Sequence, residues 1–284
     1  MKLIERGVIC LNIYGCHFTY AGVDSNTYSL IIANVDTDRD DRSAGEVTGE
    51  YLYRKSDKTF RLLGDSHNSS QMVFDVDIIT DDESVLLHAN RRAVEKWLFN
   101  KQTFRKLYID EADDPLNESF EMVNGTKKSF YLACRFVNPV KIETGCGVVG
   151  YRATIECDSG FLWQDEITYT FTAGVSDTSG TFTVTVDTDI NDYTYPDVTI
   201  TTRNGCSEFT IYNNTDDRYR TTTFSGLSGT NSIQMNGSIR YVDGSHYSNF
   251  EGFNFIRLLD GTNTFLYTGA IDSVTIKWNN RRFF

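Results

Sequence analysis

The feature that most constrains the fold is a series of short, strand-like runs in the second half of the chain. Runs such as GTFTVTVDT, DVTITTRNG and SVTIKWNN alternate apolar residues with Thr or other polar residues, and Gly, Asn or Asp separate each run from the next. They recur at intervals of about ten residues. A period of two is typical of strands with one buried face, and regular spacing favours two stacked sheets. The pattern predicts a β-sandwich over residues 166–284.

The first part of the chain also reads as strands, but with one helix. In QMVFDVDII, Phe74, Val76 and Ile78 point to one face while Asp75 and Asp77 point to the other, as in a half-exposed strand. The helix is predicted over residues 82–100. Its start is marked by the capping-box sequence TDDE at 80–83, and its apolar residues, ending with Trp97, recur every three or four positions.

Two long runs after the helix, SFYLACRFVNPVKIE and VVGYRATIECDS, flank a turn at TGCG and predict a long hairpin. Residues 1–165 therefore read as a split β-barrel or sheet domain with one helix. No linker rich in Pro, Gly or Ser separates this domain from the sandwich. The final strand, from about residue 273, could remain in the sandwich or return to the first domain.

Charge and hydropathy limit the possible partners. The formal charge is −12 and the pI about 4.8, which opposes general phosphate binding, so we expect no nucleic-acid partner. No run approaches the roughly 18 apolar residues of a spanning helix, and Lys2, Glu5 and Arg6 interrupt the first segment. We expect a soluble chain made in a cytoplasm, without a membrane partner.

The sequence offers no convincing chemistry. It has no GxSxG, GxGxxG, P-loop or HExxH motif, so we expect no enzyme, no cofactor and no metal. The segment 36–41 (DTDRDD) resembles the opening of a calcium loop, but Asp41 and Val47 stand where Gly and Glu are required, which favours a solvated acidic loop. The cysteines allow two readings, buried thiols in a cytoplasmic protein or disulfides in a secreted one: Cys10, Cys16, Cys134, Cys146, Cys157 and Cys206.

A carbohydrate-binding module or adhesin is the alternative function, because a sandwich with exposed aromatic rings can stack on sugars. The aromatic candidates are Trp163, Trp278, Tyr193 and Tyr195. Packing in the core and at sheet edges is the competing explanation for all of them.

Several short motifs occur in the same order as in phage distal tail proteins, and the chain resembles that family. The carrying segments are FIRLLDGTN at 255–263, SVTIKW at 273–278 with RRFF at 281–284, YPDVTI at 195–200, EKWL at 95–98, and YRATIEC leading to FLW at 151–163. Trp97, Pro196, Gly261 and Asn263 are the structural landmarks within them. Ile256 and Asn236 depart from the family pattern, where Pro and Asp are common.

The resemblance implies a structural protein of the virion, assembled in the host cytoplasm. Its first domain would close a homohexameric ring that joins the tail tube to the tail tip or tail-associated protein. A galectin-like sandwich would lie outside the ring and can carry receptor-binding parts.

A ring also needs a part of each protomer that reaches its neighbour. The polar stretch 36–49 is our candidate for this arm, the alternative being an ordinary mobile loop. Its named residues are Asp36, Asp38, Arg39, Asp40, Asp41 and Arg42.

Overall fold

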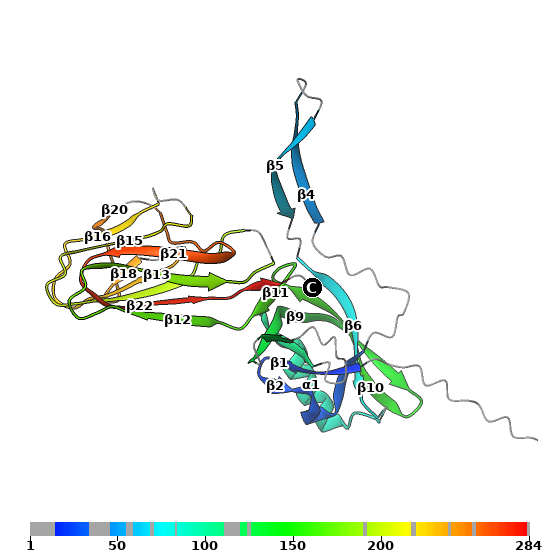
Figure 1. The fold of residues 1–284 in the computed structure, drawn as a ribbon. Coiled ribbons are helices and arrows are strands. Elements are labelled where there is room, and N and C mark those ends of the chain that lie inside the picture. The colour runs from blue at the N-terminus through cyan, green and yellow to red at the C-terminus, as the bar shows by residue number, and fades with distance from the viewer. Residues whose placement is uncertain are drawn as a thin grey trace, which may run out of the picture. The chain divides into compact units, whose positions relative to one another are not determined.

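The computed structural model describes residues 15–33, 46–54, 59–68, 71–82, 84–110, 120–123, 126–189, 192–216, 220–237, 240–251 and 254–282. The chain divides into two compact units, Met1–Trp163 with Phe283–Phe284, and Gln164–Arg282. Each unit is built almost wholly from strands (Figure 1).

The first unit is a closed barrel. Its wall has the strand order β10 (Gly147–Cys157), β6 (Val73–Thr80), β3 (Leu30–Ala33), β1 (Gly15–Tyr20), β7 (Arg105–Asp110) and β9 (Thr126–Thr144). The barrel closes because β9 also pairs with β10, through the long hairpin that the sequence predicts. Shorter elements lie along it: β2 (Val23–Asp24), the 3-10 helix η1 (Ser25–Tyr28), β8 (Phe120–Val123) and β11 (Leu162–Gln164).

Aromatic side chains fill the barrel core together with the helix α1 (His88–Phe99). The ring of Trp97 stacks on Phe18 with centroids 5.6 Å apart, and its Nε1 donates a 2.8 Å hydrogen bond to the Tyr20 carbonyl. Tyr20 meets Phe136 edge-on at 4.8 Å. Since the buried indole N–H has a partner, Trp97 joins the helix to the wall without an unsatisfied polar group.

The helix begins six residues later than the capping-box pattern predicts. Thr80 still belongs to β6, and Asp82 accepts a hydrogen bond from the Ser84 backbone N–H at 2.9 Å, which makes a tight turn. The chain then runs along the barrel, where the Leu86 N–H donates to the Val148 carbonyl at 2.8 Å. The predicted start at residue 82 is therefore wrong, because these polar side chains stabilise a turn instead of a helix end.

The second unit is a β-sandwich. One sheet has the order β12 (Ile167–Thr172), β22 (Ile271–Trp278), β14 (Asp197–Thr202), β17 (Ser232–Met235), β18 (Arg240–Val242) and β19 (Ser245–His246). The other has β13 (Ser179–Val186), β21 (Gly261–Thr268), β15 (Glu208–Asn213), β16 (Thr222–Ser225) and β20 (Phe250–Glu251). A last short strand, β23 (Arg281–Arg282), follows β22.

The sandwich core lies between these two sheets, where Phe182 stacks on both Phe171 and Phe265. Thr side chains alternate with the apolar ones along the strands, as the period of two predicts. The predicted fold class is thus confirmed: a mainly β chain, with a one-helix barrel followed by a β-sandwich.

Candidate assembly surfaces

A long hairpin of the first unit forms a sheet separate from the described strands of the barrel wall. It consists of β4 (Glu46–Arg54) and β5 (Thr59–Asn68), which pair antiparallel with a register shift between Glu50 and Tyr51. Among the strands that the structure describes, these two pair only with each other. The hairpin follows the predicted arm and shares residues 46–49 with it. The charged residues named for that arm, 36–42, lie outside the described residues.

A row of register partners crosses the outer face of the barrel wall. Ala33 in β3 is opposite Asp77 in β6, Asp77 is opposite Arg152 in β10, and Arg152 is opposite Val140 in β9. Neighbouring residues Ile78 and Tyr151 are almost fully buried in the core cluster. Because successive side chains in a strand alternate between faces, the row lies on the outside of the wall.

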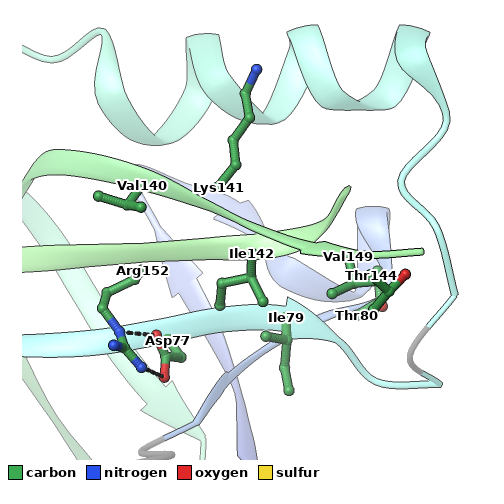
Figure 2. Close-up of a pocket in the computed structure, with 9 residues that line it drawn as sticks. All are labelled: Asp77, Ile79, Thr80, Val140, Lys141, Ile142, Thr144, Val149 and Arg152. Atoms are coloured by element: carbon green, nitrogen blue, oxygen red, sulfur yellow. Dashed lines mark hydrogen bonds and ion pairs between the residues drawn. The ribbon is translucent and has the colours of Figure 1, made fainter. Parts of the chain in front are cut away.

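The outer face is hollowed around this row (Figure 2). The hollow has a volume of about 410 Å³. Its apolar part includes the buried Ile79 and Val149, and Val140 at its margin is 61% exposed. The remaining lining residues are Asp77, Thr80, Lys141, Ile142, Thr144 and Arg152.

A bidentate ion pair forms one side of the hollow (Figure 2). Arg152 Nε and Nη2 donate to the two carboxylate oxygens of Asp77 at 2.8 and 3.0 Å. The Asp77 side chain is only 4% exposed, whereas that of Arg152 is 54% exposed. Removal of Arg152 would leave a buried carboxylate without this partner, which is costly. The two charges of the pair offset each other, so Lys141 is the remaining charged residue of the partly apolar lining.

The wall beneath the hollow is clamped to the helix. Tyr151 points inward, and its hydroxyl donates a 2.9 Å hydrogen bond to Glu95 of α1. Burial, followed by that bond to Glu95, raises the pKa of the Tyr151 phenol, so the hydroxyl keeps its proton. Phe99 packs edge-on against the same ring at 5.3 Å. The wall strand that carries Arg152 is therefore held in place by the helix, which suits a surface that packs against another protein.

The structural landmarks in the second unit lie at or near the starts of strands. Pro196 is buried directly before β14, and Gly261 begins β21 with a φ of +85°, a conformation that favours glycine. Asn263 is fully buried. Its Oδ1 accepts from the Leu259 N–H at 2.9 Å and from Asn213 Nδ2 at 2.8 Å, and its Nδ2 donates to the Leu259 and Gly261 carbonyls. Asn263 thus fixes the turn that leads into β21.

The aromatic candidates for sugar stacking differ in how far they are exposed. Trp278 is 5% exposed and donates to Asn280 Oδ1, so its ring faces are covered. Trp163 is half-buried and donates to the Asp158 carboxylate at 3.2 Å. Tyr193 and Tyr195 are exposed, and the Arg257 guanidinium lies 3.5 Å from the centre of the Tyr193 ring.

Within the described ranges, no three His, Cys, Asp or Glu side chains gather as a metal site would require. The search of those same residues for a helix long and apolar enough to cross a membrane finds none.

Sequence reasoning missed the hollow and the Asp77–Arg152 pair. The alternation around Asp77 indicated that its side chain points outward, but its partner lies 75 positions along the chain, and no local pattern connects the two. Asn213, which supports Asn263 from 50 residues away, was missed for the same reason.

Comparisons with known proteins agree with this architecture. The model of a phage tail protein N-terminal domain matches residues 13–159, and that of a phage tail C-terminal domain matches residues 161–278. Comparison with curated protein sequences gives no match.

Two solved structures align with most of the chain. The crystal structure of the Dit protein of phage SPP1, titled a paradigm of the hub adsorption apparatus in phages that infect Gram-positive bacteria, aligns with a TM-score of 0.57 at 14% identity. The alignment covers 93% of this chain and 98% of that one. A chain of the phage P2 baseplate, in its activated conformation with Ca, aligns over 93% of this chain and 97% of its own, with a TM-score of 0.45 and 7% identity. The family resemblance seen in the sequence is confirmed by the two matching models and the Dit-like fold, and the chain belongs to the family of phage tail proteins.

Proposed function

We propose that this tail protein is a non-enzymatic distal-tail hub that assembles into a homohexameric ring. The ring would join the tail tube to the tail tip or tail-associated protein, and its sandwich could carry receptor-binding parts. Assembly would take place in the host cytoplasm. The Dit-like fold supports the hub role, and the domain division at about residue 165 is part of the same proposal.

The observation that carries the ring is the β4–β5 hairpin. Its strands of 9 and 10 residues form a two-stranded sheet of their own. An isolated two-stranded hairpin is at best marginally stable in water, so a hairpin of this length favours a further contact surface. In the part of the chain that the structure describes, each of the six strands of the barrel wall already pairs with two neighbours. A contact with a second copy is the simplest way to support the hairpin.

A ring of identical protomers needs two different surfaces that fit each other. The hairpin would supply one, and the hollowed outer wall around Val140 is our candidate for the other. Its lining is partly apolar and the carboxylate of Asp77 is paired with Arg152, which suits a protein interface.

Oligomeric state tests the ring directly. The purified chain is expected to scatter light with a mass near six times 32.3 kDa and to form rings on electron-microscopy grids. A chain that remains monomeric at high concentration would contradict the ring.

A pair of matched variants tests the surface. Val140→Asp should shift the hexamer toward monomers, because a charge at the margin of the hollow would be desolvated in the interface. Val175→Asp, at a residue that is 92% exposed in the other unit, should leave the hexamer intact. In both variants the barrel and the sandwich should each melt at the same temperature as in the parent protein. A hexameric Val140→Asp protein would exclude this wall from the ring contact without excluding the ring.

A further inference from the structure

Two buried cysteines lie side by side on adjacent strands of the barrel wall. Cys134 in β9 and Cys157 in β10 are register partners, and both are 0% exposed. Their side chains belong to the same interior cluster, which also contains Tyr20 and Ile155. Both are thiols in the structure.

The backbone hydrogen bonds define which kind of pair they form. The Cys157 N–H donates to the Met72 carbonyl, away from β9. The next residue, Asp158, donates its N–H to the carbonyl of Ala133, the residue before Cys134. In an antiparallel ladder, a hydrogen bond between the residue after one partner and the residue before the other marks a non-hydrogen-bonded pair. Cys134 and Cys157 are such a pair.

This class of pair brings the side chains closest together. Its Cα atoms lie about 4.5 Å apart, which is within the roughly 4.4–6.8 Å that a disulfide spans. A hydrogen-bonded pair holds the side chains farther apart. The electrostatics agree with close approach: burial and then the neighbouring Cys157 raise the pKa of the Cys134 thiol, and burial raises the pKa of Cys157 to about 12.

The barrel gives the two thiols an environment different from that of the third cysteine in the same hairpin. Cys146, at the turn between β9 and β10, is exposed. Solution oxidants reach Cys146 directly, whereas they reach Cys134 and Cys157 only when the wall opens locally. Oxidation of the buried pair by a small molecule therefore requires local opening of the wall at β9 and β10.

We propose that Cys134 and Cys157 are a latent disulfide site, a covalent modification that locks β9 to β10 when the protein passes from a reducing to an oxidising environment. The oxidant is a small-molecule disulfide. One thiolate attacks it and releases one small thiol; the second thiolate then attacks the mixed disulfide and releases the other. Overall, two protein thiols are oxidised to one disulfide, and one small disulfide is reduced to two thiols. The site itself does not depend on the ring.

The pair can be read out separately from its neighbours. Trypsin cleaves after Lys128, Arg135, Lys141 and Arg152, which places Cys134, Cys146 and Cys157 in three different peptides. The full chain with Cys146→Ser is unfolded in urea and refolded in a buffer of oxidised and reduced glutathione, so that oxidant access does not limit the result. Remaining thiols are alkylated without reduction, and the digest is analysed by mass spectrometry.

We expect the linked Cys134–Cys157 peptides to be the main disulfide product, and the oxidised barrel to melt at a higher temperature than the reduced one. In Cys134→Ala and in Cys157→Ala the linked peptides and the redox-dependent shift should both disappear. In the control variant Cys206→Ala, which alters a buried cysteine of the sandwich, both should remain. If Cys134 and Cys157 are recovered as alkylated thiols, or joined to glutathione or other cysteines, in a correctly refolded chain, the proposal is wrong.

Discussion

Replacement of Asn263 by Ala tests how much one buried amide contributes to the sandwich. The side chain is fully buried and makes four hydrogen bonds: two with Leu259, one with Gly261 and one with Asn213. Asn213 keeps its second bond, to the Arg257 carbonyl at 3.0 Å. The groups that lose a partner are therefore chiefly the Leu259 N–H and the two carbonyls.

The expected cost follows from these groups. A buried polar group left without its partner costs about 1–3 kcal/mol. Leu259 is only half-buried, so water can replace part of what is lost there. Counting about two bonds in full gives a destabilisation of about 3 kcal/mol for Asn263→Ala. The turn into β21 should also loosen, because Gly261 loses the side chain that holds its carbonyl.

The measurement must separate the two units. Urea unfolding of the full chain, followed by hydrogen exchange on peptides from β15 and β21, reports on the sandwich, while peptides from β6 and β10 report on the barrel. Asn236→Ala is the matched control, because Asn236 bonds to Asp197 at the exposed surface and should cost less than about 1 kcal/mol. If Asn263→Ala costs no more than Asn236→Ala, the amide does not hold the turn.

Two further predictions use the same exchange measurement. Trp97→Phe should destabilise the barrel by about 2 kcal/mol and leave the sandwich unchanged, because the Tyr20 carbonyl loses its N–H donor; equal exchange in both proteins would contradict this. Hydrogen bonds from the Ser232 backbone and then from Asn231 lower the pKa of Asp243 below its usual 3.8. Its contribution to sandwich stability is thus present above that value and is lost as the pH falls below it. Asp243→Asn should make the loss of stability in acid shallower, and an unchanged acid profile would argue against this role.

Local patterns predicted the elements that depend on local physics. The sandwich strands follow from the alternation of Thr with apolar residues, and the β9–β10 hairpin follows from two runs around a Gly-containing turn. The helix start was the exception. Thr80 and Asp82 fit a capping box, but the Leu86 N–H donates to the Val148 carbonyl of the barrel, and residues 84–87 lie outside the helix.

The candidate surfaces could be predicted only in part. The arm predicted over residues 36–49 stays a prediction, because its charged residues lie outside the described ranges, and the sequence did not predict the separate two-stranded sheet over Glu46–Asn68. The hollow depends on the register that sets Asp77 opposite Arg152 and Arg152 opposite Val140. Register between distant strands is set by the packing of the whole barrel, so one local sequence run does not reveal it.

Closure of the barrel also orders the events of its synthesis. β1 pairs with β7, so His17 cannot pair until Asp110 has been synthesised. The second neighbour of β6 is β10, in which Glu156 pairs with Val73. A ribosome delivers these partners from the N-terminus onward, so the first strands emerge long before the wall can close. The β9–β10 hairpin, whose partners are close in sequence, can form quickly and then recruit the waiting strands. The barrel wall therefore cannot close before its last hairpin has been synthesised.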